Sequence, residues 1–176
     1  MLRAGAVSDG GRGSAGTVLG GTVRATVGRE TTSGAQRRPP AASPDPDDYR
    51  FVHSIRTRFA ETDAMGIIHH AAYLPYLEEA RVAYLRRLGH PYGEVRREGI
   101  NFAVLEVAVQ YRRPLVFDDQ VDVRVRAAAR SRATFQLGYL LTVDHEVHAT
   151  AVTVHGCVDA DGRARRLPSW IGDAFV

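Results

Sequence analysis

The chain has 176 residues, of which 44% are hydrophobic and 24% charged, and its formal net charge is +3 at pH 7. This composition fits one domain with an ordinary core, and the lack of any run of about 18 apolar residues excludes a membrane-spanning helix. The 23 basic residues are all arginines scattered along the sequence, whereas a nucleic-acid binder gathers its charge on one face. We therefore expect no nucleic-acid partner and no membrane span.

Residues 1–48 differ from the rest of the chain. They hold nine of the 17 glycines and close with the polar, proline-rich run RRPPAASPDPDD. Such a segment buries too little apolar surface to offset its ordering entropy. We expect residues 1–48 to be a disordered or mis-assigned extension, and residues 49–176 to form the folded domain.

One strand and one long helix are predicted first. Residues 51–59 alternate and contain β-branched side chains, which favours a strand. Residues 74–88 carry apolar side chains every three or four positions, which predicts a helix whose apolar face comprises Leu74, Leu77, Ala80, Tyr84, Leu85 and Leu88. Gly89 fits the position just past the helix, and Pro75 fits its first turn.

The remainder of the chain has a β pattern. Four further strands are predicted, over residues 101–115, 121–130, 133–143 and 147–158. A short second helix is expected over residues 92–99, and a short closing helix or arm over residues 165–175. The order of strand, helix and four strands predicts an α+β fold, an antiparallel sheet wrapped around one long central helix.

The stretch RFAETDAMGIIHHAAY, residues 58–73, gathers polar groups directly before that helix. None of the good N-cap residues stands at its start near His70. The first N–H groups therefore need water, a histidine ring nitrogen or a ligand as partner, and such a terminus favours an oxygen that gains negative charge. Asp63 lies on a glycine-containing loop that can fold over this terminus. That pairing suits acyl transfer, although a turn-capping or helix-capping role for Asp63 is the competing interpretation.

The run ETDAMGIIHHAAYLPYLEEAR closely resembles the signature of the hotdog-fold acyl-CoA thioesterases, in the 4-hydroxybenzoyl-CoA and Tol-Pal-associated thioesterase branch. The matching positions are Glu61, Asp63, Gly66, Ile67, Ile68, His69, His70, Tyr73, Glu78 and Arg81. The run VAVQYRRPLVFDD and the RRLP near the end extend the resemblance over about residues 50–170. It implies a hotdog fold and hydrolysis of an acyl-CoA thioester to a free acid and CoA, with no metal or other cofactor.

The resemblance also implies roles for single residues. Asp63 is expected to be the catalytic carboxylate, as nucleophile or general base, with the backbone N–H of His70 facing the thioester carbonyl. The His70 side chain either orients water or the thioester, or makes only a structural bond. Glu78 is expected to support catalysis near a partner subunit's site, or to form only a surface ion pair with Arg81.

Four further residues are expected to bind substrate. Gly66 and Tyr73 belong to the motif, and Arg130 and Arg132 are expected to contact the phosphates of CoA, since the arginine fork suits phosphate. Coincidence is the competing explanation for these arginines, because the chain has 23 of them. His69 stands where the family usually has tyrosine, which leaves the acyl preference open.

The remaining expectations concern assembly, compartment and alternatives. An exposed sheet edge needs pairing, so we expect a homodimer or homotetramer. The single cysteine, Cys157, and the lack of an apolar signal segment indicate a cytoplasmic protein. The alternatives are a hotdog dehydratase, for which no second histidine–acid motif is found, a thioesterase acting on carrier-protein-bound chains, and a non-catalytic acyl-CoA-binding module. An intact Asp63 argues against the last.

Overall fold

The structure, a computed structural model, describes residues 42–175. The prediction for residues 1–48 therefore lies outside the described residues, except for the last part. There Pro46–Asp48 form a 3-10 turn, η1, which Asp45 caps by accepting a hydrogen bond from the N–H of Asp47 at 3.0 Å. Within the described residues, no helix is both long and apolar enough to cross a membrane.

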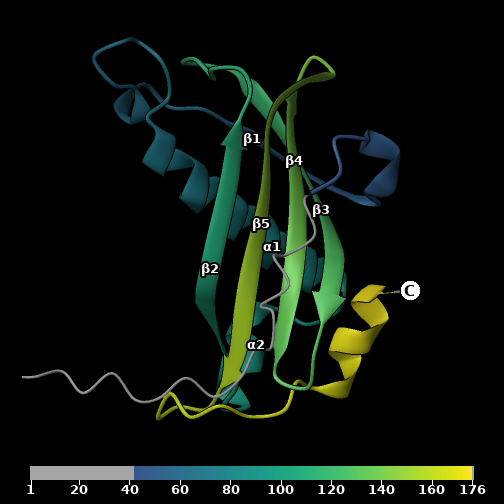
Figure 1. Cartoon of the computed structure of the whole chain (residues 1–176). Helices are drawn as coiled ribbons and strands as arrows, with labels where there is room; N and C mark the ends of the chain where they lie inside the picture. Colours follow the sequence, from purple (N-terminus) through teal and green to yellow (C-terminus); the bar gives the residue numbers. More distant parts are fainter. Residues whose placement is uncertain (1–41, 176) are drawn as a thin grey trace, which may run out of the picture. The chain divides into compact units, whose positions relative to one another are not determined.

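Five antiparallel strands form one sheet in the order β1-β3-β4-β5-β2, as predicted for an α+β fold (Figure 1). Their bounds are β1 Phe51–Arg56, β2 Asn101–Tyr111, β3 Gln120–Arg130, β4 Thr134–Val143 and β5 Glu146–Val158. The predicted first two strands are too long at their C-terminal ends. The chain leaves the sheet there to build the loops that border the site described below.

The central helix crosses one face of the sheet (Figure 1). A 3-10 turn, η3 (His70–Ala72), leads directly into α1 (Tyr73–Arg87). As predicted, Gly89 ends the helix, with a φ of 87°. Its N–H donates to Arg86 O at 3.0 Å, and the N–H of His90 donates to Leu85 O at 3.0 Å, which is the Schellman arrangement.

The buried face of α1 differs from the predicted face, because Tyr73, Tyr76 and Arg81 are buried, whereas Leu74 is exposed and Leu88 is half-buried. Its buried side chains are Tyr73, Tyr76, Leu77, Ala80, Arg81, Tyr84 and Leu85, and most of them join Val121, Val123, Leu137 and Ala149 of the sheet in one core. Leu74 was wrongly placed in this face, because it is 44% exposed, whereas Arg81 is only 4% exposed. Residues 73, 77, 80 and 84 form the centre of the buried face. Leu74 therefore lies on the side of the helix that faces β2.

Three short elements complete the fold. They are η2 (Phe59–Glu61), α2 (Tyr92–Arg97) and η4 (Ser169–Phe175). The last two confirm the predicted second helix and the closing helical arm. Ile171 of η4 is 1% exposed and belongs to the core cluster, so the arm closes the core beside α1.

Candidate active site

The loop between η2 and η3 makes a tight turn at Asp63. The Asp63 carbonyl accepts a hydrogen bond from the N–H of Gly66 at 3.0 Å, and its Oδ1 accepts one from the N–H of Met65 at 2.8 Å. Gly66 has a φ of 76°, a conformation that glycine adopts without strain. Asp63 therefore caps its own turn with one carboxylate oxygen. Its Oδ2 makes no hydrogen bond to any described residue, so it is available to a ligand.

Asp63, His70 and Tyr73 line one cavity of about 370 Å³ at the start of the helix. Ile68 also lines this cavity, and Tyr111 lines it from the end of β2. The structure thus brings three of the predicted site residues together. Gly66 does not line the cavity itself but shapes the turn that presents Asp63.

The helix start is capped by a histidine ring, one of the partners considered from the sequence. Nδ1 of His69 accepts a hydrogen bond from the N–H of Ala71 at 3.2 Å, and its carbonyl accepts one from the N–H of Ala72 at 2.9 Å. Among residues 42–175, no acceptor is paired with the backbone N–H of His70. That N–H therefore remains as a donor at the positive end of the helix dipole.

The end of β2 and the loop after it hold this helix start in place. The hydroxyl of Tyr111 donates to the carbonyl of His70 at 3.1 Å, and its ring meets the Tyr73 ring edge-on, with centroids 4.9 Å apart. The N–H of Ile68 donates to Leu115 O at 2.8 Å. Burial raises the pKa of Tyr73, so its phenol stays protonated near neutral pH. Tyr73 is therefore an uncharged part of the cavity wall, packed against Tyr111.

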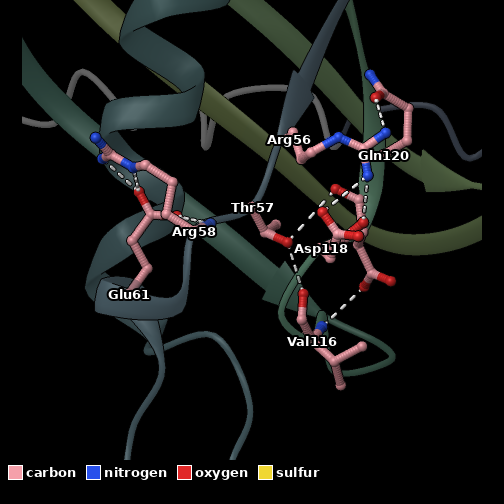
Figure 2. Close-up of polar contacts among 8 residues, drawn as sticks. Arg56, Thr57, Arg58, Glu61, Val116, Asp118 and Gln120 are labelled. Carbon is pink, nitrogen blue, oxygen red and sulfur yellow. Dashed lines mark hydrogen bonds and ion pairs between the residues drawn. The ribbon is translucent and has the colours of Figure 1, made fainter.

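Glu61 lies outside the cavity and serves as a brace. Its carboxylate accepts a hydrogen bond from the Tyr76 hydroxyl. It also accepts hydrogen bonds from the backbone N–H of Arg58 at 2.8 Å and from the Arg58 guanidinium at 2.8 Å and 2.5 Å (Figure 2). Burial acts to raise the pKa of Glu61, but these hydrogen bonds outweigh it and lower that pKa. The ionised carboxylate therefore ties the loop to α1.

Side chains at the end of β1 hold the β2–β3 turn in place by hydrogen bonds. The hydroxyl of Thr57 donates to Val116 O at 2.6 Å, and the Arg56 guanidinium pairs with Asp118 at 2.9 Å (Figure 2). Val116 in turn forms an isolated bridge with Ile67. These bonds connect the turn to the loop that carries Asp63.

Glu78 is not brought to the Asp63 cavity within one chain. It is 70% exposed, lies 3.7 Å from the guanidinium of Arg81, and lines a different cavity. The ion pair that was the competing interpretation is present. A supporting role for Glu78 stays a prediction that concerns a subunit interface.

Arg130 and Arg132 are also absent from the lining of this cavity. The Arg130 guanidinium lies over the Phe175 ring at 5.5 Å, and the Arg132 carbonyl accepts a hydrogen bond from the N–H of Leu167 at 3.0 Å. Arg112 and Arg113 line the cavity instead. No role was predicted for these two arginines from the sequence, although both belong to the run VAVQYRRPLVFDD that supported the family resemblance.

No three or more histidine, cysteine, aspartate or glutamate side chains of the described residues are grouped so that they could hold a metal ion. Among residues 42–175, Oδ2 of Asp63 and the backbone N–H of His70 both lack a hydrogen-bond partner, and both residues line one cavity. An oxygen nucleophile and an oxyanion donor are the two parts that acyl transfer requires.

A family profile, described as the thioesterase-like superfamily, matches residues 57–175. The chain belongs to the thioesterase-like superfamily. A putative esterase from Aquifex aeolicus is 36% identical over 118 residues, which cover 67% of this chain and 91% of that protein. A 1,4-dihydroxy-2-naphthoyl-CoA hydrolase from Synechococcus elongatus is 31% identical over 134 residues, covering 70% and 95%.

Solved structures confirm the predicted hotdog fold of this family. A hypothetical protein from Aquifex aeolicus superposes with a TM-score of 0.68 at 34% identity, covering 72% of this chain and 99% of that chain. A thioesterase from Thermus thermophilus, complexed with coenzyme A and Zn, gives a TM-score of 0.65 at 27% identity, covering 73% and 93%. The chain is thus a thioester hydrolase by family, and its relatives include hydrolases of CoA esters.

Proposed function

We propose that the protein hydrolyses an acyl-CoA thioester to a free carboxylic acid and CoA in the cavity at Asp63. One observation carries the proposal: Asp63 and His70 line the same cavity at the start of the central helix. Within the described part of the chain, the carboxylate has a free oxygen and the helix start has an unpaired N–H. The named CoA hydrolase among the relatives supports the choice of substrate.

The thioester carbonyl lies with its oxygen toward the N–H of His70. This N–H and the helix dipole stabilise the negative charge that develops on that oxygen as the carbonyl carbon is attacked. As general base, Asp63 takes a proton from water while the water oxygen bonds to the carbonyl carbon. The C–S bond then breaks, and the CoA thiolate leaves and is protonated.

As nucleophile, Asp63 bonds to the carbonyl carbon through Oδ2, and the C–S bond breaks to give a mixed anhydride that water hydrolyses. Both routes use the same two groups and give the same products. Hydroxylamine in the reaction distinguishes them, because it traps an anhydride on the Asp63 carboxyl as a hydroxamate that mass spectrometry of the protein detects.

Arg112 is the residue that we propose for contact with a phosphate of CoA. It lines the cavity, and its guanidinium makes one long hydrogen bond, 3.4 Å, to Gln110. Arg113 is already paired with Glu146. A guanidinium with unused N–H donors suits a phosphate better than a guanidinium that is already paired with a carboxylate.

The decisive experiment measures thiol release from short, long and aromatic acyl-CoAs by the parent protein and by Asp63→Asn. Asparagine keeps an oxygen that can accept from Met65, so the turn is preserved while the charge is lost. We expect a rate at least about 100-fold lower in Asp63→Asn. Asp159→Asn is the matched control, because Asp159 also caps a turn, by accepting from the N–H of Arg163 at 2.9 Å, and does not line the cavity.

The other outcomes assign the protein differently. Undiminished activity in Asp63→Asn would contradict the site. A folded protein that hydrolyses no CoA ester, but does hydrolyse an acyl group on a carrier protein, would move the substrate to that class. Binding of acyl-CoA without any hydrolysis would indicate the non-catalytic module.

We also propose that β2 forms an interface between copies of the chain. β2 is an edge strand of the sheet, and its exposed apolar side chains include Val104 at 55%, Leu105 at 59% and Val107 at 38%. An apolar edge strand with unpaired backbone groups favours pairing with another strand. A second copy of β2 would satisfy both the backbone and the side chains.

A further inference from the structure

A second cavity, of about 180 Å³, lies between α1 and the β2 side of the sheet. Leu74 and Leu77 line it from α1, and Val107 lines it from β2. It shares no lining residue with the cavity at Asp63. The rest of its lining combines the apolar Pro75 and Val104 with the polar side chains of Glu78, Arg81, Tyr139, Thr153 and His155. Within one chain, the proposed hydrolysis uses none of these polar side chains.

Arg81 is a buried cation on this wall. It is 4% exposed, and its Nη1 has no hydrogen-bond partner among residues 42–175. Glu78 is its one ion-pair partner within the described chain, at 3.7 Å, and that carboxylate is 70% exposed. The Tyr92 ring, with its centroid 5.2 Å from the guanidinium carbon, offsets part of the desolvation cost. A buried charge so weakly compensated favours an anion beside it.

A buried hydrogen-bond chain lies on the same wall. Thr153 Oγ1 is 3.1 Å from the Tyr139 hydroxyl and 2.7 Å from Nε2 of His155. His155 is 1% exposed, and its Nδ1 also lacks a partner within the described part of the chain. Burial and the nearby Arg81 charge lower the pKa of His155 to about 3, so the ring is neutral. When Thr153 donates to Nε2, the ring proton is on Nδ1, which then needs an acceptor.

We propose that this cavity binds a small carboxylic acid as its anion, with Arg81 and His155 donating to the carboxylate. A guanidinium and a second N–H donor suit the two carboxylate oxygens. The apolar part of the ligand lies against Leu74, Leu77 and Val107. A cavity of about 180 Å³ suits one aromatic ring, since an apolar cavity of roughly 150 Å³ takes benzene. The inference does not depend on Asp63, although thioester hydrolysis releases an acid of this class.

The test is calorimetric titration of the full chain with benzoate and with benzamide, which has the same shape and no charge. We expect benzoate to bind at least about tenfold more tightly, since hydrogen bonds to charged groups are the stronger ones. Arg81→Met is expected to abolish this preference. Arg86→Met, which removes an exposed arginine of the same helix, is the matched control and is expected to keep it.

A second variant covers the case in which Arg81→Met does not fold. Leu74→Trp changes a 44% exposed side chain and fills the entrance while Arg81 stays in place, so benzoate binding is expected to fall. Equal binding of benzoate and benzamide, unchanged benzoate binding in Arg81→Met, or no benzoate binding by the folded protein would each overturn the proposal. The proposal would also be overturned if Arg81→Met dissociated an oligomer and left benzoate binding unchanged. The acceptor for the Arg81 guanidinium would then belong to a second copy of the chain.

Discussion

The hydroxyl of Tyr111 donates a hydrogen bond to the carbonyl of His70 at 3.1 Å, so the end of β2 holds the start of the central helix. This bond joins residues that are 41 positions apart. It acts on the residue whose N–H is proposed to stabilise the oxyanion. The position of that donor therefore depends on a strand that is remote in sequence.

Tyr111→Phe is expected to lower kcat/KM about fivefold, because the loss of one hydrogen bond worth about 1 kcal/mol loosens the helix start. The phenyl ring keeps its edge contact with Tyr73. Tyr84→Phe is the control, since Tyr84 also donates to a backbone carbonyl, that of Ala174 at 3.3 Å, and does not line the Asp63 cavity. Equal losses of activity in the two variants would contradict a specific role for Tyr111.

Gly66→Ala is expected to destabilise the protein by about 1–2 kcal/mol and to reduce activity. A Cβ at Gly66 meets no heavy atom within 4 Å, so the cost comes from the φ of 76° alone. Gly93→Ala in α2 meets equally open space without a positive φ, and it is expected to be neutral or slightly stabilising. Thermal unfolding with a parallel activity assay checks both, and a Gly66→Ala protein as stable and active as the parent would refute the expectation.

Acid is expected to destabilise the protein through His155. Burial, reinforced by Arg81, lowers the pKa of this side chain from 6.5 to about 3. The unfolded chain therefore takes up a proton below pH 6.5 that the folded protein excludes. The contribution of His155 to the free energy of unfolding is complete above pH 6.5 and is lost as the pH drops toward 3. Between pH 7 and pH 5 the loss is about 2 kcal/mol.

The measurement compares urea unfolding at several pH values for the parent and for His155→Gln, which cannot take up this proton. The variant is expected to lose about 2 kcal/mol less than the parent over that interval. His145→Asn, in the exposed turn between β4 and β5, should follow the parent. An unchanged pH slope in His155→Gln would show that other groups cause the acid sensitivity.

Leu105→Arg is expected to weaken the proposed interface along β2, because it places a charge on an apolar edge strand. Val52→Arg is the matched control on β1, the opposite edge, where Val52 is 40% exposed. Light scattering coupled to size-exclusion chromatography gives the mass of each variant. Dissociation by Val52→Arg but not by Leu105→Arg would move the interface to the other edge, and a monomeric parent would contradict it.

The sequence by itself determined the elements of the fold and the composition of the Asp63 loop. The period along α1, the alternation along β3 and the glycine that ends the helix are local signals, since each depends on neighbours within a few positions. The motif from Glu61 to Arg81 likewise identified the family. Asp63 lies in the loop, and His70 and Tyr73 lie at the helix start that directly follows it, so the three residues are close together.

Only the tertiary structure decided which distant side chains join them. Arg112 and Arg113 reach the cavity because β2 ends beside the helix start, whereas Arg130 and Arg132 lie at the β3–β4 turn. The burial of Arg81 likewise arises from how α1 rests on the sheet, which the period of apolar residues did not reveal. Contacts between strands and helices depend on packing across the whole domain, and no local pattern encodes which charged side chain that packing encloses.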